Sequence, residues 1–148
     1  MWNNLKSLTL SIIVTRFLMA AILPVLFFLP YLGKMYLTIR GSDEKTLLQL
    51  IIPLYACAIP AGIVLVCLDR MLRRIKKDIV FVHSNIQTIR IISWCCFIIC
   101  LIAGASSCFY IPYVFIVIIM FFCGLIVRVI KNVFAKAVLL KDENDYTI

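Results

Sequence analysis

Few side chains in this sequence could do chemistry, and most of them lie between residues 69 and 90 or after residue 131. Asp69 stands four residues before Arg73, a spacing at which opposite charges stabilise a helix. His83 is the single histidine, and a lone histidine in a turn is more often a solvated residue than a base or a ligand. A Ser-His-Asp set, paired carboxylates and a phosphate-binding glycine loop all lack their parts. We therefore predict no enzymatic activity, no cofactor and no metal site.

The cysteines are the other candidates for metal or redox chemistry. Nearly all lie in apolar stretches, where cysteine packs as a small hydrophobe and is usually inert. No pair has CxxC spacing together with a second pair or with clustered histidines. We interpret the seven cysteines as packing residues: Cys57, Cys67, Cys95, Cys96, Cys100, Cys108 and Cys123.

The elements that must position these residues follow from the composition. The chain has 148 residues, of which 64% are hydrophobic and 15% charged, and its mean hydropathy is +1.09. Globular domains carry about a quarter charged residues, and a soluble fold of this size exposes too much surface to hide so many apolar side chains. The excess must face lipid. Disorder is excluded because disordered chains are poor in apolar residues.

Four apolar stretches are long enough to cross a bilayer, which takes about 20 residues of helix. The predicted spans cover about residues 10–32, 47–68, 91–110 and 113–130. Pro112 suits the beginning of a helix and indicates a tight reversal between the last two spans. The continuous runs favour helices over a barrel, whose strands alternate polar and apolar residues. We predict one all-α domain over residues 1–148, an integral membrane four-helix bundle.

The distribution of Lys and Arg predicts the orientation, because cytoplasmic loops carry an excess of both. Twelve of the fifteen basic residues fall at the N-terminal end up to Arg16, between the second and third spans, or at the C-terminal end from Arg128 on. The chain is thus expected in the cell membrane with both termini cytoplasmic, a loop at 69–90 and a tail at 131–148. This topology explains most of the net charge of +8 without a nucleic acid, and anionic lipids of the inner leaflet can use the remainder.

Two features inside the spans have structural explanations. Arg16 lies near one end of its span, where an arginine is expected to snorkel to the interface. The first two spans contain two prolines each, which kink a helix and are tolerated when a neighbour satisfies the freed carbonyl. Two interpretations are open. The prolines either bend helices that simply pack together, or they form a hinge or a small cavity. These prolines are Pro24, Pro30, Pro53 and Pro60.

The second and fourth helices are expected to extend into the cytoplasm. Leu68, Leu72, Ile75 and Ile79 repeat at helical spacing among basic residues, and a similar apolar stripe runs through the chain after residue 125. Ser84 followed by Gln87 matches a capping box, which predicts the start of the third helix there and a turn at about 80–83.

Two charged blocks of the sequence, one around residues 68–92 and one at the C-terminal end, resemble those of a known family. Their motifs are Leu68-Asp69-Arg70-Met71-Leu72, Ser84-Asn85 with Ile89-Arg90-Ile91-Ile92, and the ending Glu143-Asn144-Asp145-Tyr146-Thr147-Ile148. Together they resemble the small four-span bacterial membrane proteins of domain of unknown function family 2975. Tyr146 departs from the leucine that is more frequent there. The resemblance implies a small cytoplasmic helix-turn-helix regulator as partner, because such genes often neighbour one for that regulator.

The same residues form the candidate site. Asn85 can bond to backbone at a helix start, and Arg90 can reach a carboxylate supplied by Glu143 or Asp145, with Asn144 as a further cap. The blocks either pack against each other or bind a partner, and both can hold. The candidate residues are Asp69, Arg70, Asn85, Arg90, Glu143, Asn144, Asp145 and Thr147.

We predict a non-enzymatic interaction protein that binds or tethers the regulator, with the lipid bilayer as its other partner and no direct nucleic-acid binding. An alternative is membrane transport or immunity to an antimicrobial peptide, with the bundle acting alone or as a homo-oligomer. A structural subunit of a larger membrane complex is the third.

Overall fold

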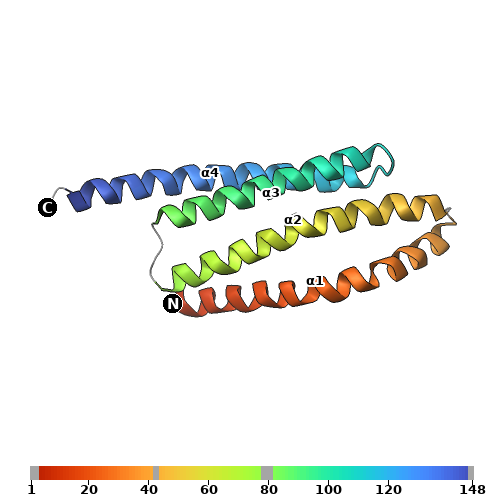
Figure 1. Cartoon of the computed structure of the whole chain (residues 1–148), viewed down its shortest axis with the longest axis horizontal. Helices are drawn as coiled ribbons and strands as arrows, with labels where there is room; N and C mark the ends of the chain where they lie inside the picture. Colours follow the sequence, from red (N-terminus) through yellow and green to blue (C-terminus); the bar gives the residue numbers. More distant parts are fainter. Residues whose placement is uncertain (1–3, 42–43, 78–81, 147–148) are drawn as a thin grey trace.

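The structure is a computed structural model that describes residues 4–41, 44–77 and 82–146. These residues form four helices, α1 (Asn4–Arg40), α2 (Glu44–Lys76), α3 (His83–Ser107) and α4 (Tyr113–Tyr146), and no strand (Figure 1). Each helix is long and apolar enough to cross a membrane. The predicted all-α class with four membrane-spanning helices is therefore confirmed.

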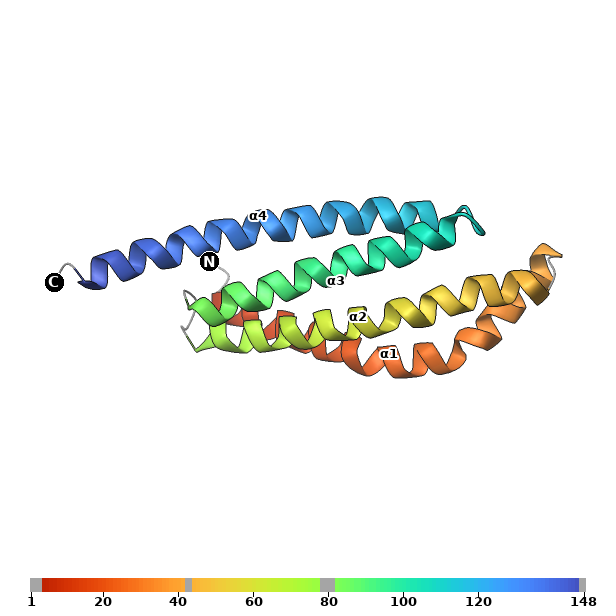
Figure 2. The ribbon, with the colours of Figure 1, turned by 45° about the horizontal axis from the view of Figure 1, so that its top comes forward.

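The helices form an open row (Figure 2). In the described part of the chain α1 packs on α2, α2 on α3 and α3 on α4, and no other pair of helices has Cα atoms within 8 Å. The bundle is thus open between α1 and α4. The outer helices keep most of their apolar side chains exposed, for example Phe27 at 81% and Phe115 at 72%.

The packed interior is built on α2 and α3, the two helices that each have a neighbour on both sides. Cys67 of α2 and Ile92 and Cys96 of α3 form a buried cluster. Ala103 of α3 is fully buried. On the α4 side a Cβ on Gly124 would lie 3.2 Å from the Phe97 ring, so glycine lets α3 and α4 approach closely.

A tyrosine compensates one of the proline interruptions. Pro30 has no N–H, so the carbonyl of Leu26, four residues earlier, loses its helical donor. The Tyr55 hydroxyl of α2 donates to that oxygen at 2.7 Å. The expectation that a neighbour satisfies a freed carbonyl is confirmed for Pro30. Figure 2 shows that α1 as a whole bows away from a straight path.

A second tyrosine contact ties α4 to α2 at the end of the molecule where α3 meets α4. Tyr113 donates its hydroxyl to the carbonyl of Leu50 at 2.5 Å, one turn before Pro53. Nearby, the hydroxyls of Tyr36 and Tyr110 are 3.0 Å apart. These side chains connect helices whose backbones do not approach each other.

The start of α3 and the reversal after it test two of the predicted boundaries. The capping box at Ser84 is wrong, because α3 begins at His83 and extended Val82 (φ −138°, ψ 140°) is the cap residue, with no side-chain cap bond. Ser84 already lies in the first turn, where its carbonyl accepts the Thr88 hydroxyl at 2.9 Å. At the other boundary, the reversal after α3 is confirmed, with Phe109 and Tyr110 N–H groups both 3.0 Å from the Ser106 carbonyl. Ile79 and residues 80–81 of the predicted turn lie outside the described residues.

Candidate functional site

The antiparallel row brings the start of α1, the end of α2, the start of α3 and the end of α4 to one end of the molecule (Figure 1). We call this the basic end, because it carries twelve of the fifteen basic residues. They are Lys6, Arg16, Arg70, Arg73, Arg74, Lys76, Lys77, Arg90, Arg128, Lys131, Lys136 and Lys141.

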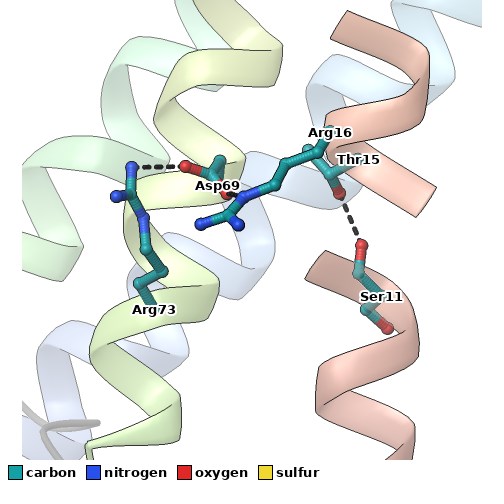
Figure 3. A network of polar contacts seen from close by, with 5 residues as sticks. All are labelled: Ser11, Thr15, Arg16, Asp69 and Arg73. Carbon is teal, nitrogen blue, oxygen red and sulfur yellow. Dashed lines mark hydrogen bonds and ion pairs between the residues drawn. The ribbon is translucent and has the colours of Figure 1, made fainter. Parts of the chain in front are cut away.

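A buried carboxylate organises the α1 side of the basic end. Asp69 of α2 has a side chain only 8% exposed, and both of its oxygens are engaged. Arg16 reaches across from α1, with its Nε 3.3 Å from Oδ1, and Arg73 pairs with Oδ2 from one turn further along α2. Figure 3 shows the two arginines converging on Asp69 from different helices. The expected pairing of Asp69 with Arg73 is confirmed.

The Arg16 contact was missed by sequence reasoning, which explained this residue by snorkelling alone. Its side chain is 60% exposed, so it is anchored at its Nε while most of it stays accessible. Buried Thr15 beside it donates to the Ser11 carbonyl at 2.8 Å (Figure 3). Opposite charges on two successive apolar helices at similar depth were the signal that could have predicted the pair.

Each further pair of neighbouring helices is also joined by a polar contact at this end. Arg74 of α2 donates to the Asn85 side-chain oxygen of α3 at 3.4 Å, and Asn85 is fully buried. His83 of α3 lies 3.5 Å from Asp142 of α4. Together with Arg16 and Asp69, these contacts link all four helices in chain order.

The structure thus brings only some of the candidate residues together. Asp69 and Asn85 are the buried acceptors of the contacts just described, and Arg70 is exposed beside them. Asn144 and Asp145 are placed only as part of α4, without their side chains, and Thr147 lies outside the described residues.

The sequence predicts that Arg90 reaches a carboxylate of Glu143 or Asp145, and of these two the structure describes the side chain of Glu143 alone. Arg90 lies beside Arg128 and Lys131 around a pocket of about 230 Å³, which Ser93, Trp94 and Phe97 complete. Glu143 is twelve residues beyond Lys131, about 18 Å further along α4 at 1.5 Å per residue. The order of residues in the sequence allowed a pairing of Arg90 with Glu143, but the axial offset of α3 and α4 separates these two side chains.

A larger pocket of about 740 Å³ opens between α1 and α2 at the basic end. Of the described residues that line it, six are cationic and none is acidic, and four of the nine belong to α1. The lining residues are Thr9, Ile12, Ile13, Arg16, Arg70, Arg73, Arg74, Lys76 and Lys77. Such a wall can bind an anion. Within the described residues no three His, Cys, Asp or Glu side chains gather as metal ligands.

Four apolar helices with a charged end define a multi-pass α-helical membrane protein. The family model described as Protein of unknown function (DUF2975) matches residues 31–148. The chain belongs to this family, and the resemblance inferred from its two charged blocks is confirmed. No curated protein and no solved structure matches the chain. The matched region contains Asp69, Arg73 and Asn85 but begins after Arg16.

Proposed function

We propose that this chain is a non-enzymatic anchor in the bacterial plasma membrane, with both termini cytoplasmic. It holds a small cytoplasmic helix-turn-helix regulator at the membrane. The orientation is supported by the basic end, because an excess of Lys and Arg marks the cytoplasmic side. The nature of the partner is supported by the resemblance of the charged blocks to the family in which such a regulator is a frequent neighbour.

The observation that carries the proposal is the reach of α4. Its Asp142 lies beside His83, the first residue of α3, and α4 continues as a helix to Tyr146. Figure 1 shows the C-terminal end of α4 projecting past the other three helices. A helix end without a neighbouring helix is available to a partner.

The chemistry of this projecting end suits a basic partner. Leu139 and Leu140 are 58% and 63% exposed, and the carboxylates of Asp142 and Glu143 follow after Lys141. An apolar patch next to carboxylates complements the mixed apolar and basic surface typical of a DNA-binding protein, since opposite charges steer association. We therefore place the tether at residues 139–145.

Membrane fractionation of the regulator tests the proposal. Deleting residues 142–148 should move the regulator to the soluble fraction, while the anchor stays in the membrane because the four predicted spans end before these residues. The matched control is Asp43→Asn with Glu44→Gln, which removes two carboxylates from the sequence between the first two predicted spans and should leave the regulator membrane-bound. A regulator whose soluble fraction is the same with and without the anchor would disprove the tether.

A further inference from the structure

We propose that the pocket between α1 and α2 binds the phosphate headgroup of an anionic membrane lipid. The site is distinct from the projecting end of α4 and does not depend on the tether. Its chemistry rests on charge, on the composition of its two walls and on its depth along the helices.

Charge is the first argument. Six cationic side chains line the pocket, and the carboxylate of Asp69 is the negative group that contacts two of them. Among the residues that the structure describes there, six formal positive charges against one negative leave a strong surplus in one concave surface. A phosphate is the common anion that arginine and lysine recognise, because it accepts several of their N–H groups at once.

The cations are held ready for a ligand. Asp69 fixes Arg16 through its Nε, so the terminal amino groups of this guanidinium can donate elsewhere. Asn85 accepts from one terminal nitrogen of Arg74 in the same way. Arginines restrained by protein contacts lose less conformational entropy when an anion binds.

The second wall favours a lipid over free phosphate. Thr9, Ile12 and Ile13 of α1 face the cationic wall of α2, and Ile13 is 58% exposed. A headgroup on the arginines would place its acyl chains along this apolar surface. Free phosphate has no apolar part that could pack against these side chains.

The depth of the pocket along the helices also fits a lipid headgroup. Asp69 directly follows the apolar stretch 47–68, and Arg16 lies within the first predicted span, so the pocket sits where apolar helix gives way to charge. Phosphate groups occupy that level in a bilayer, and basic pockets between membrane helices on the cytoplasmic side are suited to anionic headgroups. The pocket volume of about 740 Å³ is within the range of ligand sites.

Spin-labelled lipids measure the preference directly. The full chain is reconstituted in phosphatidylcholine vesicles containing labelled phosphatidylglycerol or labelled phosphatidylcholine, and the immobilised fraction of each label is compared. We expect a several-fold preference for phosphatidylglycerol. Arg70→Gln with Lys76→Gln should reduce it to near one, since both side chains line the pocket and neither makes the contacts to Asp69 and Asn85.

The matched control removes two charges from the same end outside the pocket. Lys136→Gln with Lys141→Gln should retain the preference. Arg70→Lys with Lys76→Arg keeps both charges and should retain it as well, which separates lost charge from a disturbed fold.

Three results would overturn the site. The first is no preference in the unmodified chain. The second is an equal loss in the pocket variant and the Lys136/Lys141 control, which would indicate a diffuse field. The third is displacement of the labelled lipid by inorganic phosphate at constant ionic strength, which would make free phosphate the ligand.

Discussion

Asp69 is the residue on which the basic end is organised. Opposite charges in water contribute little when both are exposed, but this carboxylate is 8% exposed and contacts an arginine on each of two helices. The pairing with Arg73 could be predicted because it is local to one helix. The pairing with Arg16 could not, since 53 residues separate the two positions.

We expect Asp69→Asn to lower the stability of the protein by about 1–2 kcal/mol, since charge-assisted bonds contribute about 1.5–3 kcal/mol and solvent screens the half-exposed arginines. Thermal unfolding in detergent measures the change. Asp142→Asn is the matched control, because its side chain is 46% exposed and pairs only with His83 among the contacts described here. Its cost should stay below about 1 kcal/mol. Equal shifts in the two variants would contradict an organising role for Asp69.

At the scale of elements, the kinked helices depend on their neighbours. Prolines at 24, 30, 53 and 60 are visible in the sequence, but the identity of the group that satisfies a freed carbonyl is not. The structure supplies Tyr55 for the carbonyl left open by Pro30. This couples a residue of α2 to a proline of α1.

A double-mutant cycle tests that coupling. Tyr55→Phe should cost about 1 kcal/mol of stability, because it leaves the Leu26 carbonyl without its donor. In a Pro30→Ala background, where residue 30 regains an N–H, the same substitution should cost close to nothing. Tyr31→Phe, on a ring 69% exposed, is the control. A Tyr55→Phe cost that is the same in both backgrounds would rule out the compensation.

The close approach of α3 and α4 makes a second prediction at this scale. Gly124→Val should destabilise the protein by about 1–3 kcal/mol, since its side chain would overlap Phe97 and Cys96. Gly62→Val is the matched control, because a Cβ there meets nothing within 4 Å. Thermal unfolding of both variants in detergent compares them, and equal stability would show that α3 and α4 can separate without cost.

At the scale of the whole molecule, the open row leaves its two ends chemically different. The basic end holds the starts of α1 and α3 and the ends of α2 and α4, while Cys108 is exposed in the turn at the other end. The proposed orientation therefore puts the Cys108 thiol outside the cell.

Labelling in intact cells tests this orientation. A variant that keeps Cys108 and replaces the other six cysteines with alanine should react with a membrane-impermeant maleimide. A second variant with a single cysteine introduced by Asp145→Cys should react only after the cells are lysed. The reverse pattern would show that the topology is inverted and that the proposed tether does not face the cytoplasm.

The amino-acid sequence alone determined the four helices, the family and the gathering of charge at one end. These depend on the length and apolarity of each stretch and on the order of charges, which can be read from the linear sequence. Whether the helices close into a ring, whether Arg16 meets Asp69, and where Arg90 lies relative to Glu143 were decided by the tertiary structure. Such contacts depend on the rotation and axial offset of one helix against another, and a shift of one residue turns a side chain by about 100°.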